Sequence, residues 1–360
     1  LIVDNRSDST DNPYTYGCED DSVSVGSRVL VPFANGNRLR KGYVASVMDN
    51  VADDMKAKLK FVEEVDEEVS LTPEMMRTAV WLRNRYLCRY IDAVRCFTPA
   101  GEKAKRREKK DPFAGREDKT DPVEKLTEQQ TEALEKITRA IEEGKHARFL
   151  IHGVTGSGKT EIYIRAAEKT LAQGKNVIVL VPEISLTTQT IDRFTGRFGS
   201  GRMAVLHSRM TPGERYDQWK KIRDGRVDIV IGARSAVFAP LEDIGLIVMD
   251  EEHEATYKSD QTPKYDTVEV AIKRLQDRDN GGVLILGSAT PSVVTYSRAR
   301  DGIYQLLELT ERYNKVCMPE VSVVDMRSEL KSGNRSMISR ELYVAMKEEL
   351  ERGKQVMLFL

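Results

Sequence analysis

The stretch Phe149-Leu-Ile-His-Gly-Val-Thr-Gly-Ser-Gly-Lys-Thr-Glu161 decides the fold of this chain. Its apolar start predicts a buried strand, and a helical pattern begins at Glu161. Between them, Gly153 to Thr160 reads Gly-x-x-x-x-Gly-Lys-Thr, a pattern in which glycines turn backbone N–H groups and a helix N-terminus toward phosphate oxygens. The simpler alternative is a glycine-rich turn before an ordinary helix. The strand before the loop and the helix after it favour a phosphate-binding loop.

The loop supplies candidate ligands for a nucleoside triphosphate and its Mg²⁺. Lys159 is expected to reach the β- and γ-phosphates, and the Thr160 hydroxyl is expected to coordinate Mg²⁺. The residues expected to surround the phosphates are Gly153, Val154, Thr155, Gly156, Ser157, Gly158, Lys159 and Thr160.

Composition limits the remaining function classes. The chain has 360 residues, 40% of them hydrophobic, and a net charge of −1, which suits two or three domains with hydrophobic cores. Nucleic-acid binding must therefore come from local basic patches. No apolar run approaches the ~20 residues of a membrane-spanning helix, and the polar N-terminus resembles no signal peptide.

Cysteine use and chain ends give two further expectations. The four cysteines form no Cys-x-x-Cys pair, which indicates neither a zinc site nor a disulfide scaffold and favours a reducing cytoplasm. They are Cys18, Cys88, Cys96 and Cys317. Because the chain starts at Leu1 and ends on the apolar run 356–360, we expect it to be a fragment of a longer protein.

Residues 1–98 predict a small, barrel-like β domain closed by one helix. Strands are expected at 27–33, 38–47 and 56–65, with Asn35-Gly36 as a hairpin turn between the first two. Thr72-Pro73 is expected to begin the helix, with Thr72 as the N-cap. Its arginines suggest either a DNA-facing stripe or a solvated surface, and we favour the surface. They are Arg77, Arg83, Arg85 and Arg89.

Residues 99–125 read as a basic linker whose composition cannot bury a core. The two readings are a soluble tether and a flexible contact to nucleic-acid phosphates, and both stay open. The basic cluster is Lys103, Lys105, Arg106, Arg107, Lys109 and Lys110.

Residues 126–328 predict an α/β domain built on a doubly wound parallel sheet. A helix at 126–143 begins with a capping box, Thr127 and Gln130. Mostly apolar strands alternate with helices, as in a parallel sheet covered on both faces. They are expected at 149–152, 177–182, 203–206, 227–231, 245–250 and 283–287, with two further strand-like pieces in 303–328. A helix at 338–352 and a strand at 355–360 indicate the start of another α/β unit.

A second group of chemical residues follows the apolar strand that begins at Gly245. Asp250 is expected to be the second protein partner of Mg²⁺, and Glu251 is expected to orient and deprotonate the attacking water. A surface acidic loop is the bland alternative, but it becomes improbable beside a phosphate loop on the same sheet. After a third apolar strand, Ser288 and Thr290 are placed to hydrogen-bond the acidic group.

Together these motifs resemble the first RecA-like lobe of a superfamily 2 helicase. Further segments are similar to the PriA family of primosomal replication-restart helicases, over nearly the whole chain except the linker. The segments that carry the likeness are Val154–Glu161, Val181–Gln189, Leu206–Ser208, Ile231–Ala236, Asp250–Lys258 and Leu286–Pro291, with Val29–Phe33 and Lys41–Val44 near the N-terminus.

The resemblance implies ATP hydrolysis with Mg²⁺, which drives 3′→5′ movement on single-stranded DNA at stalled forks before helicase loading. It implies forked and single-stranded DNA, primosome and helicase-loading proteins and single-stranded DNA-binding protein as partners, at the nucleoid in bacterial cytoplasm, without a membrane. It also implies that His253 couples the acidic motif to Ser288 and Thr290. Gln130 stands where the family reads adenine, although the capping box also explains it.

The resemblance implies two sets of DNA contacts. In the 3′-DNA-binding domain they are Tyr14, Thr15 and Lys60, as an aromatic for stacking, a neutral hydrogen-bonding group and a cation. In the motor lobe they are Pro182, Glu183, Thr187, Arg234 and Ser235, with Tyr257, Lys258 and Lys264 in a loop that couples DNA to ATP hydrolysis.

The chain departs from the family pattern at both sets of contacts. Lys264 replaces an Arg and cannot offer its bidentate fork, and Asp266-Thr267 replaces His-Ala. In the end pocket, Thr15 replaces an Asp and Ala34 a Gly. We expect weaker end recognition and weaker coupling.

By the same resemblance, the domains are expected at 1–98 (3′-DNA-binding), 99–125 (linker, with the family's winged helix absent), 126–328 (helicase lobe 1) and 329–360 (start of lobe 2). A zinc region, the rest of lobe 2 and its arginine are expected beyond Leu360, so this chain alone should hydrolyse little ATP. One alternative is an ATP-gated, fork-binding scaffold for helicase loading. Another is a phosphate-loop kinase that acts on a small molecule.

Overall fold

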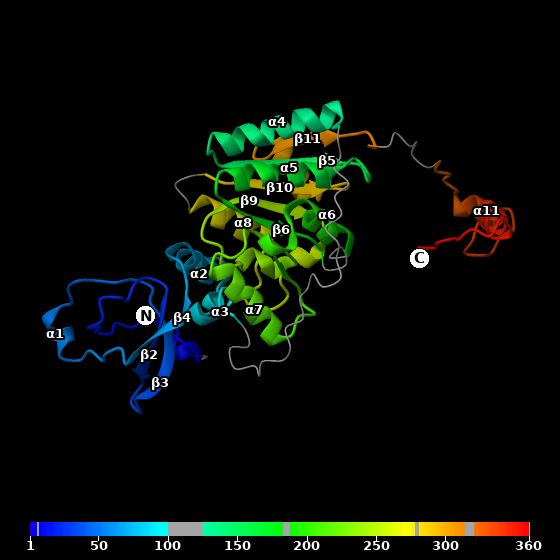
Figure 1. Ribbon diagram of the computed structural model, residues 1–360. Helices are drawn as coiled ribbons and strands as arrows, with labels where there is room; N and C mark the ends of the chain where they lie inside the picture. Colours follow the sequence, from blue (N-terminus) through cyan, green and yellow to red (C-terminus); the bar gives the residue numbers. More distant parts are fainter. Residues whose placement is uncertain (6, 100–124, 183–187, 278–280, 314–319, 360) are drawn as a thin grey trace. The chain divides into compact units, whose positions relative to one another are not determined.

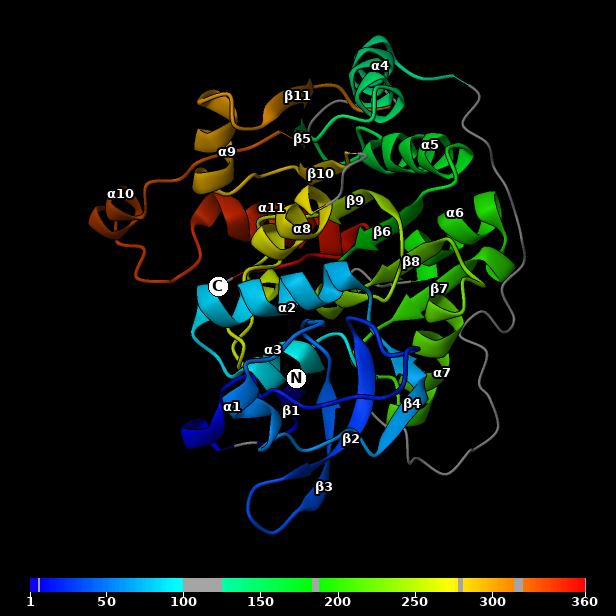
Figure 2. The ribbon, with the colours of Figure 1, turned by 90° about the vertical axis from the view of Figure 1, so that its left-hand side faces the viewer.

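The computed structural model describes residues 1–5, 7–99, 125–182, 188–277, 281–313 and 320–359. The chain forms two compact units, Leu1–Asn314 and Lys315–Leu360. The first unit contains a four-stranded sheet in the order β1-β3-β2-β4 and a seven-stranded sheet in the order β11-β5-β10-β9-β6-β8-β7 (Figures 1 and 2). The basic linker expected at 99–125 lies almost entirely outside the described residues.

The elements of the N-terminal region are β1 (Ile2–Val3), η1 (Asp8–Thr10), β2 (Ser27–Phe33), β3 (Arg38–Tyr43), α1 (Asp53–Lys56), β4 (Glu64–Ser70), α2 (Pro73–Tyr86) and α3 (Tyr90–Arg95). The hairpin between β2 and β3 confirms the expected turn, and Thr72 caps α2 by accepting a hydrogen bond from the Met75 N–H at 3.2 Å. In the loop 34–37 the left-handed residues are Ala34 (φ 54°) and Asn37 (φ 44°).

Three expectations for this region are wrong. The strand expected at 56–65 lies at Glu64–Ser70 instead. The alternating residues before Glu64 pair with no described strand and form one isolated bridge, between Gly17 and Phe61. The sheet is open rather than barrel-like in the described residues, with β1 and β4 at its edges, and two helices rather than one pack on it.

The parallel sheet and its helices fill the rest of the first unit. Its strands are β5 (Ala147–Gly153), β6 (Asn176–Leu180), β7 (Met203–Leu206), β8 (Ile229–Gly232), β9 (Ile244–Asp250), β10 (Val283–Ser288) and β11 (Gln305–Leu309). Its helices are α4 (Glu128–Glu142), α5 (Lys159–Ala172), α6 (Thr188–Phe198), η2 (Ser200–Arg202), α7 (Pro212–Arg223), η3 (Arg234–Phe238), η4 (Ala255–Tyr257), α8 (Thr267–Gln276) and α9 (Val293–Arg300).

The apolar strands are buried on both faces, as expected. On β5, Phe149 and Ile151 join the core beneath α4, α5 and α6, while Leu150 between them joins the core on the other side. That second core also receives side chains from α2, α3, α7 and α8. Alternate residues of the strand therefore pack against helices on opposite faces of the sheet, and α2 and α3 belong to one of these two layers.

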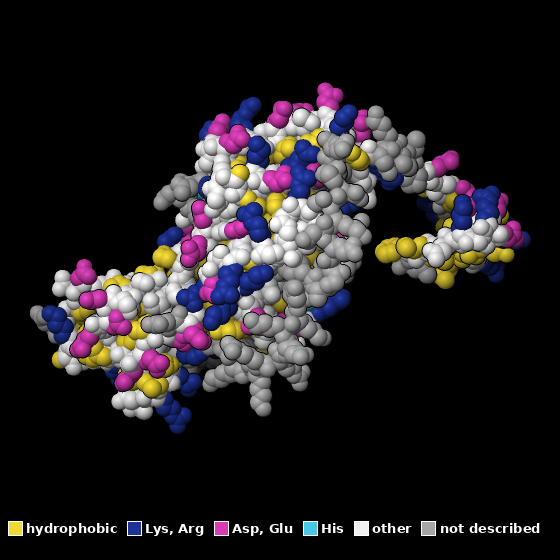
Figure 3. All heavy atoms as spheres, viewed as in Figure 1, with side chains coloured by type: hydrophobic (Ala, Val, Ile, Leu, Met, Phe, Trp, Pro, Cys, Tyr) yellow, Lys and Arg dark blue, Asp and Glu magenta, His cyan; other side chains and the backbone are white. Residues whose placement is uncertain are grey.

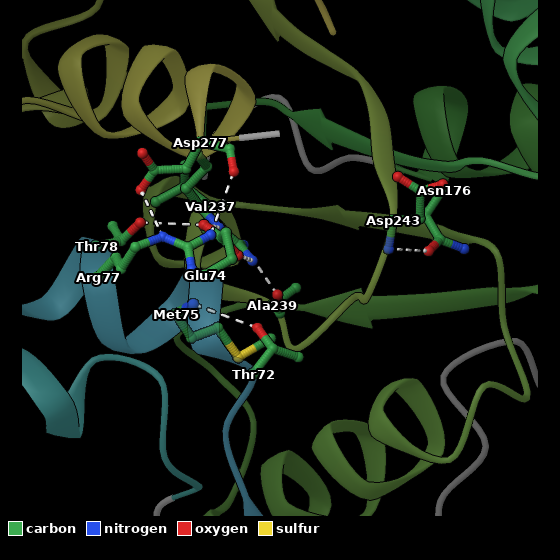
Figure 4. A network of polar contacts seen from close by, with 11 residues as sticks. Thr72, Glu74, Met75, Arg77, Thr78, Asn176, Val237, Ala239, Asp243 and Asp277 are labelled. Atoms are coloured by element: carbon green, nitrogen blue, oxygen red, sulfur yellow. Dashed lines mark hydrogen bonds and ion pairs between the residues drawn. The ribbon is translucent and has the colours of Figure 1, made fainter. Parts of the chain in front are cut away.

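Helices α2 and α3 lie between the two sheets (Figures 1 and 2). Figure 4 shows Glu74 of α2 beside Val237 and Ala239 of the lobe. There Arg274 of α8, with a side chain 0% exposed, pairs with Glu74 at 2.9 Å. The Arg274 guanidinium also donates to the carbonyl oxygens of Val237 at 2.7 Å and Ala239 at 2.9 Å. A fully bonded buried ion pair thus joins the two regions.

The second unit contains α10 (Met326–Lys331) and α11 (Arg340–Glu351), capped by Asp325 and Ser339. Of the two strand-like pieces expected in 303–328, β11 is present. The described residues between it and 325 form neither strand nor helix, and α10 begins at Met326. Residues 355–359 form no strand either, because no described strand pairs with them.

Charges of both signs are interspersed on the face of the first unit seen in Figure 3, in keeping with the net charge of −1. None of the helices in the described ranges combines the length and hydropathy that crossing a bilayer requires.

Candidate nucleotide site and DNA-facing segments

The register of three strands brings the two chemical motifs to one edge of the sheet. Gly287 on β10 pairs with Ile151 on β5 and with Asp250 on β9. Neighbouring strands lie about 4.8 Å apart, so β5 and β9 are separated by roughly 10 Å. That spacing leaves room for phosphate groups and a metal ion between the loop after β5 and the carboxylate of Asp250.

The loop after β5 has the geometry of an anion cradle. Gly156 and Gly158 have φ angles of 82° and 81°, which side chains rarely adopt. The Lys159 ammonium donates to the Gly153 carbonyl oxygen at 2.9 Å, across the loop. The Ser157 hydroxyl is buried without a hydrogen-bond partner in the described structure. An ammonium and an unsatisfied hydroxyl in one cradle fit a phosphate.

The Gln130 side chain holds this loop against α4. Its Oε1 accepts from the Thr127 N–H at 2.9 Å in the expected capping box, and its Nε2 donates to the Ser157 carbonyl oxygen at 2.7 Å. A Cβ on Gly158 would lie 2.2 Å from that Nε2, so glycine is needed there. Both ends of the amide are already bonded, and adenine reading by Gln130 stays a prediction.

Asp250 is held by a residue that sequence reasoning missed. The Tyr163 hydroxyl of α5 donates to Asp250 Oδ1 at 3.0 Å. Burial raises the pKa of Asp250 and Glu251 raises it further, whereas Tyr163 and Lys159 oppose the rise. A Cβ on Gly287 would lie 1.7 Å from the Tyr163 hydroxyl. The absence of a side chain at Gly287 therefore makes the Tyr163–Asp250 contact possible.

The residues after Asp250 connect to the third motif. Glu251 has a φ of 47°, an uncommon conformation for a non-glycine residue and one that often marks functional sites. Its carboxylate lies 3.7 Å from His253 Nδ1. That nitrogen lies 2.8 Å from Ser288 Oγ, which accepts from the Thr290 N–H at 3.0 Å. The contacts form one chain from Glu251 to Thr290.

Glu252 is a second residue that sequence reasoning missed. It is 7% exposed, and its carboxylate accepts from the Ser292 N–H at 2.7 Å and from the Thr295 hydroxyl at 2.9 Å. These bonds fix the first turn of α9 to the acidic motif. The only sequence signal is Ser292 as an N-cap, which does not identify its distant partner.

The segment after β11 also reaches the phosphate loop. The Tyr313 N–H donates to the Gly156 carbonyl oxygen at 2.9 Å. Gln129, beside Gln130, exchanges two hydrogen bonds of 2.9 Å with Thr310. The segment 310–313 therefore flanks the candidate nucleotide site.

The candidate DNA contacts of the lobe differ in exposure. Ser235, Lys258 and Lys264 are exposed, while Pro182 is buried. Glu183 and Thr187 lie outside the described residues. Tyr257 is 3% exposed and its hydroxyl donates to the Asp250 carbonyl oxygen at 2.7 Å, so it faces the acidic motif rather than a DNA strand.

The Arg234 side chain is bonded to the backbone of the segment 256–258. Its guanidinium donates to the Thr256 carbonyl oxygen at 3.2 Å and also to that of Lys258. It lies over the Tyr265 ring at 5.8 Å from the ring centre. A phosphate contact from Arg234, which the sequence suggested, would compete with these bonds.

In the N-terminal domain, Tyr14 contacts the end of β2 and Lys60 contacts the turn after it. The Tyr14 ring packs edge-on against Phe33 at 5.3 Å, and Thr15 follows, partly buried. The Lys60 ammonium donates to the carbonyl oxygen of Ala34 at 2.7 Å and to Asn37 Oδ1 at 2.7 Å. The left-handed φ of Ala34 explains why glycine suits that position. Phe61, 50% exposed beside Lys60, is an aromatic that sequence reasoning missed.

Comparison with known proteins defines the class. Residues 127–298 match the DEAD/DEAH box helicase family, and residues 1–99 match the 3'DNA-binding domain (3'BD) of PriA. The chain thus joins a DNA-binding domain to a helicase-type lobe. Among solved structures, RecG bound to a three-way DNA junction aligns with 86% of this chain and 40% of its own, at 18% identity and a TM-score of 0.44.

Curated relatives define the family. Replication restart protein PriA of Bacillus subtilis is 53% identical over 242 residues, which are 67% of this chain and 30% of that protein. Replication restart protein PriA of Treponema pallidum is 38% identical over 340 residues, 93% of this chain and 50% of that protein. The chain belongs to the PriA family, and it spans at most about half the length of these two relatives.

Proposed function

We propose that this chain supplies the DNA-end-binding domain and the first motor lobe of an ATP-dependent, 3′→5′ DNA helicase that restarts replication at stalled forks. The observation that carries the proposal is the convergence of Lys159 and Asp250 at one sheet edge, in a chain that also matches a 3'DNA-binding domain. We assign 1–98 to DNA-end binding, 99–125 to a linker, 126–328 to lobe 1 and 329–360 to the start of lobe 2.

The positions of Lys159, Asp250, Glu251 and His253 support the roles proposed here. Lys159 leaves the Gly153 carbonyl to bind phosphate oxygens, and Thr160 and Asp250 hold Mg²⁺. Bound ATP with Mg²⁺ supplies the scissile phosphoanhydride and its charge neutralisation. Glu251 orients the attacking water and takes its proton. His253 couples the acidic motif to Ser288 and Thr290.

The proposed partners are forked and single-stranded DNA, primosome and helicase-loading proteins and single-stranded DNA-binding protein, in the bacterial cytoplasm at the nucleoid. The matched DNA-binding domain and the restart function named in the relatives support this assignment. An arginine from a second lobe typically contributes about 10³–10⁵ in rate. We therefore expect this chain alone to bind ATP but to hydrolyse it slowly.

The test is ATP hydrolysis by the full-length protein with and without forked DNA. We expect DNA to stimulate hydrolysis, Lys159→Ala to abolish it, and Lys169→Ala, an exposed lysine on the same helix, to leave it unchanged. Nucleotide-dependent fork binding without hydrolysis would support a scaffold instead. Phosphorylation of a small molecule without DNA would support a kinase.

A further inference from the structure

The N-terminal domain contacts the lobe at the loop 257–266. Arg85 at the end of α2 forms two bonds to the Glu269 carboxylate of α8, at 2.8 and 3.0 Å. The neighbouring Tyr86 hydroxyl donates to Glu269 at 2.7 Å and accepts from the Asp266 N–H at 3.2 Å. One hydroxyl of the DNA-binding domain is therefore bonded to the last residue of the loop.

The two ends of this loop are tied together. Lys258 forms an antiparallel bridge with Asp266, and the Ser259 N–H donates to the Tyr265 carbonyl oxygen at 2.8 Å. The Thr267 hydroxyl donates to the Tyr257 carbonyl oxygen at 2.6 Å. Because these bonds join the two ends of the loop, a displacement of Asp266 must also displace Tyr257.

Tyr257 in turn contacts the candidate metal ligand, because its hydroxyl donates to the backbone carbonyl oxygen of Asp250 at 2.7 Å. A separate aromatic contact reaches the same loop from the N-terminal region. Phe97 packs edge-on against Phe238 at 5.0 Å, and Phe238 packs edge-on against Tyr265 at 4.9 Å. Polar and apolar contacts therefore join the N-terminal domain to the loop and the acidic motif.

We propose that Tyr86 of the DNA-binding domain and Thr267 are positioning residues that set the loop 257–266, so that DNA bound by the N-terminal domain and nucleotide bound at Lys159 and Asp250 strengthen each other. This inference rests on the proposed function and adds the residues through which the two sites communicate. Thr267 is included because its side chain makes one of the bonds that tie the two ends of the loop together.

The test uses this chain with a non-hydrolysable ATP analogue, Mg²⁺ and a forked duplex that has a free 3′ end. Its readout is the ratio of the DNA dissociation constants without and with the analogue, which by linkage equals the effect of DNA on the analogue. We expect a ratio of about 5 or more in the unaltered chain. Tyr86→Phe and Thr267→Val should bring the ratio close to 1 while each ligand alone binds as before.

The matched control is Arg77→Ala. Arg77 also lies on α2 and faces α8, where it bonds to the Asp277 carbonyl oxygen at 3.3 Å, away from the loop. The Arg77→Ala variant should give the same ratio of DNA dissociation constants as the unaltered chain. An unchanged ratio in Tyr86→Phe, or an equal loss in Tyr86→Phe and Arg77→Ala, would overturn the inference.

Two outcomes separate this inference from the proposed function. If the unaltered chain binds both ligands but with a ratio near 1, the inference fails and the proposed function stands. If the analogue does not bind, or binds Lys159→Ala equally well, the proposed function itself fails.

Discussion

At the scale of single residues, the Tyr163–Asp250 contact depends on Gly287. Gly287→Ala would place a Cβ 1.7 Å from the Tyr163 hydroxyl, which must then move away from Asp250. We expect the variant to lose about 1–3 kcal/mol of unfolding free energy, the usual cost of overpacking a core. Gly201→Ala is the control because a Cβ there meets nothing within 4 Å. Urea unfolding that gave both variants the same stability would contradict this role of Gly287.

Asp250 should make the free chain less stable at neutral pH. Burial raises the pKa of Asp250 in the folded chain, so the folded chain binds the Asp250 proton more tightly than the unfolded chain does. Unfolding free energy then falls as pH rises from the unfolded value of about 3.9 through the raised folded pKa. Asp250→Asn carries no charge and should melt at a higher temperature than the unaltered chain near neutral pH, with the gain lost in acid. Calorimetry of the ligand-free proteins would show it, and a lower melting temperature for Asp250→Asn at neutral pH would argue against it.

Lys60 should matter to DNA-end binding because its ammonium bonds the turn 34–37 to the segment that contains Phe61. A charged hydrogen bond is worth roughly 1.5–3 kcal/mol, so Lys60→Ala should weaken binding of a fork with a free 3′ end by about 10-fold or more. Lys58→Ala, two positions away and exposed, is the control. Fluorescence anisotropy with equal affinities for both variants would remove this pocket from the proposal.

At the scale of elements, α2 and α8 are joined by the buried pair Glu74–Arg274. Arg274→Met leaves a buried carboxylate without its partner and should cost about 3–5 kcal/mol. Arg77→Ala at the same interface removes a contact of 3.8 Å from a side chain 55% exposed and should cost less than about 1 kcal/mol. Denaturant unfolding would compare them, and similar losses would mean that the pair does not hold the two regions together.

Local patterns predicted the elements that carry chemistry. The phosphate loop, the acidic strand end and the capping box of α4 each depend on residues within a few positions of one another, so spacing alone indicates them. The strand expected at 56–65 failed because alternation does not supply a pairing partner. Likewise, the family resemblance predicts that Tyr257 faces DNA. In the structure its hydroxyl donates instead to the carbonyl oxygen of Asp250, at the end of the preceding strand.

The partners of the site could not be predicted in the same way. Tyr163 and Asp250, Glu252 and Ser292, and Tyr86 and Asp266 are far apart in sequence. Only the strand order and the docking of α2 bring them together. An arginine or tyrosine on a helix carries no local sign of such a partner: Arg77 and Arg85 are exposed, as expected, yet Arg85 bonds to Glu269 of α8.

At the scale of the whole molecule, the central claim is that Lys159 and Asp250 bind one nucleotide–metal complex. The direct measurement is calorimetric binding of a non-hydrolysable ATP analogue, with and without Mg²⁺, to this chain and to Lys159→Ala, Asp250→Asn and Lys169→Ala. We predict that Lys159→Ala weakens binding about 10- to 100-fold, that Asp250→Asn removes the gain in affinity from Mg²⁺, and that Lys169→Ala changes neither. Mg²⁺-dependent binding that survived in both Lys159→Ala and Asp250→Asn would contradict the claim.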